Sequence, residues 1–142
     1  MMTLGLSREA ILRDTMGMLR TWIAIENPLR PGTRHELPET LVDTGAELTW
    51  VPRSALEALG IAPRKRVQFQ MADGSVIERE IGYAMVYAGD TETIDEVMFG
   101  DAGDLVLLGA HALQGLNLKV DLIGKRLVAG GPMLAACEVA AA

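Results

Sequence analysis

Apolar and polar positions along the chain form short runs separated by turn residues, which is typical of many short β-strands. Most apolar runs are rich in β-branched or aromatic residues and end at Gly, Pro or Asp. Such runs predict strands rather than long helices. Two segments, Pro52–Ile61 and Ala110–Leu118, instead favour short helices. We expect roughly seven to nine strands and two helices, the second broken by Gly115.

The turn residues divide the remaining pattern into strands, loops and hairpins. Asp73-Gly74 is the dipeptide favoured in primed hairpin turns and marks the clearest hairpin. In chain order we expect a strand at Thr21–Pro28, a two-proline loop at Leu29–Pro38, two apolar runs around a corner at Glu39–Pro52, hairpins at Arg66–Ile81 and at Gly82–Gly100 around Gly89-Asp90, a continuous strand at Asp104–Gly109, and a last hairpin at Lys119–Gly130 around Gly124-Lys125.

This order of elements has neither the strand–helix alternation of a parallel sheet nor a solenoid repeat. An all-β fold, closed into a barrel or sandwich, is the natural class. A chain of 142 residues is long enough for one domain with a real core, but not for two. We expect the domain at residues 21–130, an N-terminal appendage at 1–20 that could be flexible, and a C-terminal tail at 131–142.

Charge and cysteine content exclude several classes of function. The net charge is −6, and the one basic cluster, Arg64-Lys65-Arg66, is expected to be a solvated loop rather than a nucleic-acid site. Cys137 is the only cysteine, which excludes an internal disulfide and fits a reducing compartment. Charged residues interrupt the N-terminal apolar run, and no run of about 18 apolar residues exists. A soluble, cytoplasmic protein without a membrane or nucleic-acid partner is expected.

The candidate chemistry lies in the stretch LVDTGAELTWVP, where an apolar strand ends in an acid. Asp43 follows two apolar residues, so its carboxylate is expected at the mouth of a cleft. Thr44 can bond neighbouring backbone, Gly45 permits a close backbone approach, and Ala46 keeps the next position small. Asp-Thr-Gly is also good turn chemistry, so the motif alone leaves a plain turn open.

Other reactive residue types lack supporting partners. His35 and His111 are far apart in the sequence, so we expect no metal site and no cofactor. Ser54, Ser75 and Cys137 have no visible histidine and acid partner, which leaves a serine or cysteine hydrolase unsupported.

A second motif lies about 65 residues after the first, where Leu107, Leu108 and Gly109 end an apolar strand before a short helix. With LVDTGA before it and the hairpin MADGSVIEREIG between them, the sequence resembles the retropepsin-like aspartic proteases, the single-lobe class of retroviruses and bacterial homologues. The order of parts covers about residues 21–128. The resemblance implies a closed acid-protease barrel of short strands with one or two short helices.

The resemblance also implies the roles of the site residues. The chain has one DTG, so the family's chemistry would need a homodimer with one Asp43 from each subunit on the two-fold axis, acting on a peptide or protein substrate. Thr44 would bond across the dimer, and Gly45 and Ala46 would line the floor. The flap tip would consist of Ala72, Asp73, Gly74 and Ser75, and Leu107, Leu108 and Gly109 would pack beneath the active-site loop.

The sequence departs from the retroviral pattern in the flap, which has fewer glycines, and after Gly109, where Ala110 and His111 replace an arginine. Asp73 near the flap tip could disfavour acidic substrates or simply serve the turn. The leading hypothesis is an aspartic endopeptidase. The alternative is a non-catalytic peptide-binding or scaffold dimer that keeps the fold.

Overall fold

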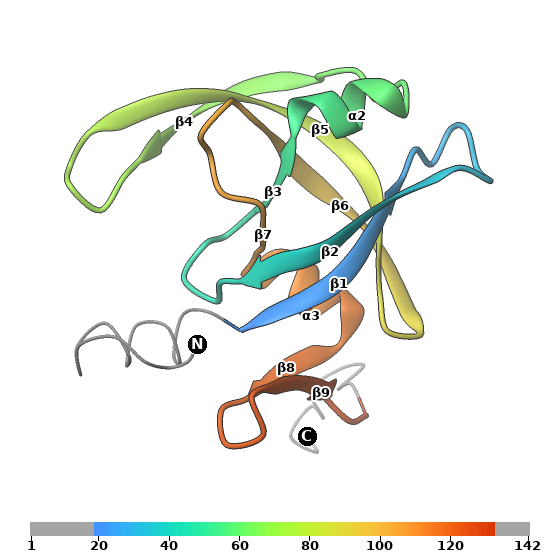
Figure 1. The fold of residues 1–142 in the computed structure, drawn as a ribbon. Helices are drawn as coiled ribbons and strands as arrows, with labels where there is room; N and C mark the ends of the chain where they lie inside the picture. The colour runs from blue at the N-terminus through green and yellow to red at the C-terminus, as the bar shows by residue number, and fades with distance from the viewer. Residues whose placement is uncertain (1–18, 133–142) are drawn as a thin grey trace, which may run out of the picture.

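The computed structural model describes residues 19–132, which form a closed β-sheet, two short helices and a separate hairpin (Figure 1). The prediction of an all-β fold with two short helices is confirmed for these residues. In chain order the elements are β1 (Arg20–Glu26), β2 (Arg34–Val42), β3 (Thr49–Pro52), α2 (Arg53–Ala58), β4 (Lys65–Gln70), β5 (Val76–Ala88), β6 (Thr91–Gly100), β7 (Leu107–Leu108), α3 (Ala110–Leu116), β8 (Leu118–Asp121) and β9 (Arg126–Ala129).

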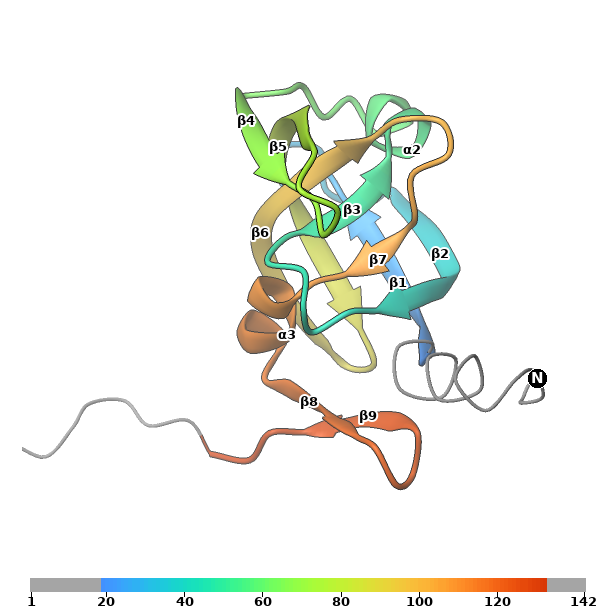
Figure 2. The ribbon, with the colours of Figure 1, turned by 90° about the vertical axis from the view of Figure 1, so that its left-hand side faces the viewer.

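The main sheet closes on itself through the pairing of β1 with β5. Its strand order is β1-β2-β7-β3-β6-β5-β4, and the added β1–β5 ladder joins the first strand to the sixth. Strand β4 lies outside this ring and pairs with β5 alone, so the β4–β5 hairpin projects from the closed part (Figure 2). Closure leaves the ring strands without a free edge. The β8–β9 hairpin forms a second, two-stranded sheet.

The core fills the closed sheet and the space beneath the two helices. Its largest fully buried side chains include Phe99 of β6, Leu56 of α2 and Leu116 of α3. Burying a side chain of this size stabilises the fold by about 1.5–3 kcal/mol. Neither helix of residues 19–132 is long and apolar enough to cross a membrane.

The expected loop at Leu29–Pro38 is partly wrong, because β2 begins at Arg34. The β1–β2 ladder changes register there: Thr21 faces Thr40, whereas Ile23 already faces Leu37. Pro38 and Glu39 therefore both lie opposite Trp22 of β1. A bulge of this kind tolerates a proline inside a strand, because the missing N–H is not needed for a regular ladder bond.

Two further expectations about local structure are also wrong. The expected strand at Asp104–Gly109 is regular only at Leu107–Leu108, because a turn closed by an Asp104 N–H bond to Asp101 O precedes it. Helix α3 runs through Gly115 instead of breaking there. A Cβ at Gly115 would lie 2.3 Å from Thr93 Oγ1, so the glycine lets the helix pack closely on β6.

The turn of the β4–β5 hairpin differs from the two-residue primed turn that the sequence predicts. Met71 N donates to Ser75 O at 2.7 Å, which leaves a three-residue loop with Gly74 at φ +88°. A three-residue loop that ends in a left-handed glycine is the next most common hairpin design. The Gly89-Asp90 turn does have the expected two residues, between Ala88 and Thr91.

A buried carboxylate joins β1 to β5 and to the loop before β2. Glu26 is 6% exposed and accepts hydrogen bonds from the Tyr87 hydroxyl and from Gly32 N. The guanidinium of Arg34 lies 3.6 Å from the centre of the Tyr87 ring. The Tyr87 hydroxyl, the Gly32 N–H and the Arg34 charge together lower the pKa of Glu26 despite its burial.

The substitution Tyr87→Phe is expected to destabilise the fold in a pH-dependent way. A carboxyl group whose pKa is lowered by folding stabilises the protein above its unfolded value, and this contribution disappears as the pH falls through the folded value. Wild type should therefore exceed Tyr87→Phe in stability at pH 7, and the difference should shrink as the pH falls below about 4.5. Urea denaturation of both proteins between pH 3 and pH 7, roughly, measures this difference. A difference that stayed constant over this range would contradict the role of Glu26.

Candidate active site

Asp43 is placed by two strands that run side by side at one end of the closed sheet. Strand β2 pairs in parallel with β7, with Leu41 beside Leu107 and Val42 beside Leu108. The ladder continues one bond further, because Asp43 N donates to Leu108 O at 3.0 Å. The two sequence motifs, 65 residues apart, are thus neighbours, and the acid is the first residue beyond the paired strands.

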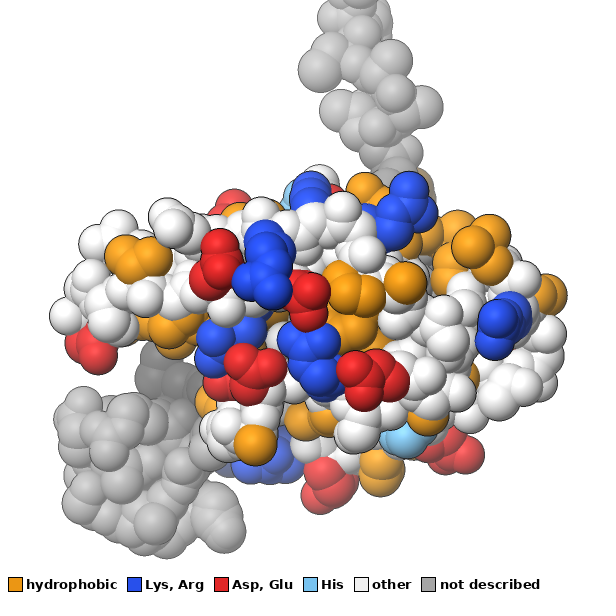
Figure 3. All heavy atoms as spheres, turned by 90° about the horizontal axis from the view of Figure 1, so that it is seen from above, with side chains coloured by type: hydrophobic (Ala, Val, Ile, Leu, Met, Phe, Trp, Pro, Cys, Tyr) orange, Lys and Arg blue, Asp and Glu red, His pale blue; other side chains and the backbone are white. Residues whose placement is uncertain are grey.

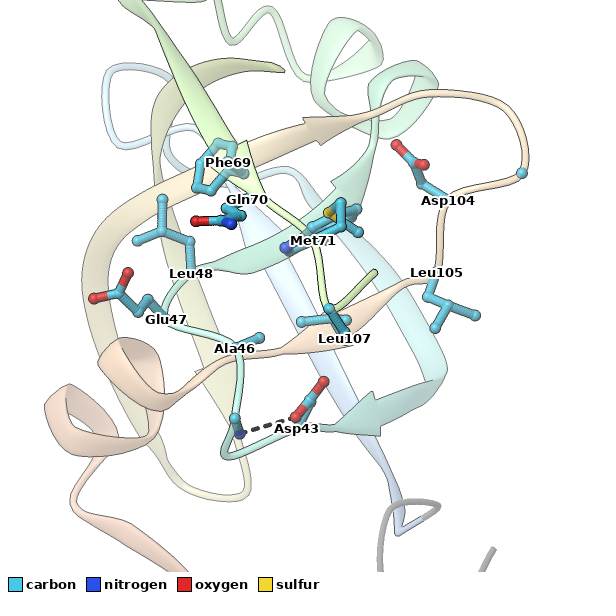
Figure 4. Close-up of a pocket in the computed structure, with 14 residues that line it drawn as sticks. Asp43, Ala46, Glu47, Leu48, Phe69, Gln70, Met71, Asp104, Leu105 and Leu107 are labelled. Atoms are coloured by element: carbon cyan, nitrogen blue, oxygen red, sulfur yellow. Dashed lines mark hydrogen bonds between the residues drawn. The ribbon is translucent and has the colours of Figure 1, made fainter. Parts of the chain in front are cut away.

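The corner after β2 fixes the carboxylate of Asp43 through its own backbone. Gly45 N donates to Asp43 Oδ1 at 2.9 Å, and Ala46 N donates to Asp43 O at 3.2 Å (Figure 4). A Cβ at Gly45 would lie 3.3 Å from Asp43 Oδ1, which is tighter than most contacts of a real Cβ. Asp43 is half-buried, whereas Thr44 and Gly45 are exposed in the single chain. The corner therefore presents one carboxylate in a defined orientation.

Gly109 lies directly beneath this corner. A Cβ on Gly109 would lie 2.5 Å from Leu48 O and 3.0 Å from Ala46 O, so only glycine lets the two segments approach this closely. Gly109 N donates to Oγ1 of Thr49, a threonine that is fully buried. Leu108 beside it is fully buried in the core.

The first turn of α3 holds the segment after the corner. Ala110 N donates to Ala46 O at 2.7 Å, and His111 N donates to Glu47 O at 3.0 Å. The first N–H groups of a helix have no partner within the helix, so they are free to bind neighbouring carbonyls. The helix that follows Gly109 thus supports the floor on which Asp43 stands.

A cleft of about 510 Å³ opens above this floor. Asp43 lies at one end of it, and the tip of β4 with the following loop covers it from the opposite side (Figure 4). A third wall is the loop between β6 and β7. The lining residues are mostly apolar: Asp43, Gly45, Ala46, Glu47, Leu48, Trp50, Phe69, Gln70, Met71, Ala72, Gly103, Asp104, Leu105 and Leu107.

The four predicted flap residues have different positions in the structure. Ala72 lines the cleft, whereas Asp73, Gly74 and Ser75 complete the exposed hairpin loop. Asp73 Oδ1 accepts hydrogen bonds from the hydroxyl and the N–H of Ser75, and both bonds lower the pKa of Asp73. Its carboxylate serves the turn, which is the simpler of the two interpretations of this residue.

Several residues of the cleft wall cannot be recognised from the sequence pattern. Phe69, Met71 and Leu105 are ordinary apolar residues of strands and loops, and only the fold brings them to the same cleft as Asp43. Thr49 could have been noticed as a hydroxyl inside an apolar run. Asp104 could not have been recognised from the sequence, because an acid near a glycine is the usual composition of a turn.

The arrangement limits the chemistry available to a single chain. In residues 19–132 no group of three or more His, Cys, Asp or Glu side chains is placed to hold a metal ion. Asp43 is one carboxylate with a hydrogen-bonded oxygen, an apolar cleft above it and a hairpin over the cleft. A reaction that uses a carboxylic acid and a carboxylate in the same step requires a second group in a different protonation state.

Comparison with known proteins gives one matching family model and similar solved structures. The family model described as "gag-polyprotein putative aspartyl protease" matches residues 35–115, which include the corner, the hairpin and Gly109. One solved structure that is similar is the foamy viral protease-reverse transcriptase in complex with RNA/DNA hybrid, with a TM-score of 0.46 and 17% identity over 68% of this chain. The chain spans 12% of that protein. No curated protein matches the chain.

Gly109→Ala is expected to destabilise the fold by about 2–3 kcal/mol, because its Cβ would overlap the backbone carbonyl of Leu48 and make a tight contact with that of Ala46. Urea denaturation measures the loss, and amide chemical shifts of residues 43–49 should move with it. Gly89→Ala is the control, because its Cβ would meet nothing within 4 Å and only the positive φ adds about 1 kcal/mol of strain. Equal losses in the two variants would argue against the close approach.

Proposed function

Because the chain belongs to the gag-polyprotein aspartyl protease family, we propose that it is an aspartic endopeptidase that acts as a homodimer. The observation that carries the proposal is the half-buried Asp43 carboxylate, held by its own corner at the end of a covered cleft. A peptide in extended form suits such a cleft, since strands on either side can bind its main chain.

The second carboxylate of the reaction would be Asp43 of a second subunit. Asp43 stands at the surface end of its corner, and the neighbouring Thr44 is exposed, which leaves both accessible to another chain. Two carboxylates about 3 Å apart cannot both ionise cheaply, so they share one proton and titrate as a pair. Thr44 would bond across the two-fold axis beneath them.

Each carboxylate then has a separate task in hydrolysis. The ionised Asp43 takes a proton from a water molecule as its oxygen attacks the peptide carbonyl carbon, and the protonated Asp43 donates to the carbonyl oxygen. The tetrahedral diol collapses when the Asp43 that took the proton from water donates it to the nitrogen and the other Asp43 takes a proton back from a diol hydroxyl. The C–N bond then breaks and leaves a carboxylic acid and an amine. The β4–β5 hairpin would close over the substrate and exclude water. A cytoplasmic location stays a prediction from the sequence.

Asp43→Asn is expected to abolish cleavage while the fold survives, because the amide cannot exchange the proton. Mixing provides a sharper test of the dimer: in an equal mixture of wild type and variant, activity per wild-type chain should fall by about half, since random pairing leaves only about a quarter of dimers with two acids. Asp90→Asn, in the exposed β5–β6 turn, is the control and should not reduce activity. Cleavage by Asp43→Asn would refute the mechanism.

Sedimentation equilibrium, with and without a statine-type peptidomimetic, separates the enzyme from the alternative function. An endopeptidase should form a dimer that the ligand tightens, because the ligand binds the paired site and not the single chain. A monomer that is indifferent to the ligand would argue against the paired site. A dimer that captures peptides but leaves every bond intact would instead support the non-catalytic binding module.

A further inference from the structure

An ion pair outside the proposed catalytic machinery joins the hairpin to the cleft wall. Arg79 lies on β5, within the arm of the β4–β5 hairpin, and Asp104 lies in the loop between β6 and β7, where it lines the cleft. Arg79 Nε donates to Asp104 Oδ2 at 2.9 Å, and Nη2 donates to Oδ1 at 3.2 Å. The two side chains therefore meet in the bidentate geometry that makes such pairs strong.

The surroundings of Asp104 restrict it to this arrangement. Asp101 N donates to Asp104 Oδ2 at 2.8 Å, and Asp104 N donates to Asp101 O at 3.0 Å in the turn. The Arg79 bond is the main cause of a lowered pKa of Asp104, so the carboxylate is ionised at neutral pH. Asp104 and Arg79 are only 17% and 16% exposed.

A second arginine of the same hairpin provides a contrast. Arg66 Nη1 lies 2.9 Å from Glu78 Oε1, but these side chains are 63% and 49% exposed and do not line the cleft. Figure 3 shows the face above β4, β5 and α2, where basic and acidic side chains alternate. Exposed ion pairs of this kind contribute little to the stability of the fold. The Arg79–Asp104 pair differs because it is more enclosed and one member borders the cleft.

Asp104 is a charged residue in a cleft wall that is otherwise mostly apolar. Its neighbours along the cleft include Met71, Leu105 and Leu107, and Leu105 is 62% exposed there. Contact with these groups would strengthen the binding of an apolar substrate side chain. An unpaired carboxylate beside them would instead strengthen the binding of a positively charged side chain. Arg79 supplies the compensating charge from behind the wall, because it is not among the residues that line the cleft.

We propose that Arg79 is a specificity-determining residue of the cleft: by pairing with Asp104 it prevents that carboxylate from binding substrate and keeps this wall selective for apolar side chains. The inference rests on the proposed function, because it concerns peptides in the same cleft. The pair also ties the hairpin arm to the loop that leads into β7, so it positions the two walls relative to each other. Arg79 acts through Asp104 and touches no reacting atom.

Arg79→Leu tests the proposal, because it leaves Asp104 charged and unpaired. Peptides that carry Leu, Lys or Glu in turn at each position beside the scissile bond are compared by kcat/KM. At one position or more, the Lys-to-Leu ratio should rise roughly five- to tenfold over wild type. The double variant that combines Arg79→Leu and Asp104→Asn should return the Lys-to-Leu ratio to its wild-type value. Arg66→Leu is the matched control and should leave the ratio unchanged.

A second variant keeps the test decisive where Arg79→Leu fails to fold. Asp104→Asn removes one negative charge from the wall and leaves Arg79 with only the more distant Asp101, whose Oδ2 lies 3.5 Å from Arg79 Nε. The Glu-to-Leu ratio should therefore rise instead of the Lys-to-Leu ratio. A purely structural role would lower kcat/KM for all peptides alike. Unchanged ratios in a folded Arg79→Leu or Asp104→Asn, or an equal change in Arg66→Leu, would overturn the proposal.

Binding separates failure of this proposal from failure of the proposed function. Affinities of statine-type peptidomimetics with Leu or Lys at the same positions are measured by calorimetry for each variant. If wild type cleaves nothing but Arg79→Leu still shifts the affinity ratio toward Lys, the endopeptidase proposal fails and the role of Arg79 stands. If wild type cleaves peptides and no ratio shifts, only the role of Arg79 fails. If wild type neither cleaves nor binds, both are overturned.

Discussion

The close approach of Gly109 to the backbone of Leu48 is the constraint on which the candidate site depends. At this point the chain after β7 passes so near the segment after the Asp43 corner that a single Cβ would overlap a carbonyl oxygen. The approach allows the first turn of α3 to bind two carbonyls of that segment. It also lets β2 and β7 run in parallel up to Asp43. The absence of a side chain at Gly109 thus allows the packing that holds both the floor of the cleft and Asp43.

The cleft above this floor lies between a corner that is hydrogen-bonded on several sides and a hairpin that projects from the closed sheet. The corner of Asp43 is held by bonds within residues 43–46 and by α3, whereas the β4–β5 hairpin projects from the closed sheet with β4 paired on one side only. Catalytic geometry requires groups that are fixed in place, and access for a substrate requires a cover that can move. In this fold the Arg79–Asp104 pair is an ionic connection between the projecting hairpin and the loop before β7.

Several sequence predictions were accurate where one local signal decided the structure, and they were wrong where packing decided it. The hairpin at Gly89-Asp90 formed as its turn dipeptide predicts, and the strand at Thr21–Pro28 formed as β1 within a residue or two. The sequence predicts that Gly115 breaks a helix, but the glycine instead leaves room for Thr93, which an added Cβ would overlap. The pattern predicts a loop at Pro38, but a bulge against β1 accommodates this proline within a strand.

The sequence by itself determined the all-β class, the corner that presents Asp43 and its relation to an aspartyl protease family, because these follow from short-range patterns of turn residues and apolar runs. Only the tertiary structure decided what surrounds the acid. The cleft wall joins residues near positions 47, 70 and 105, and the partner of Asp104 lies 25 residues before it. Contacts of this range depend on how the sheet closes, and closure is a property of the whole set of strands rather than of any segment.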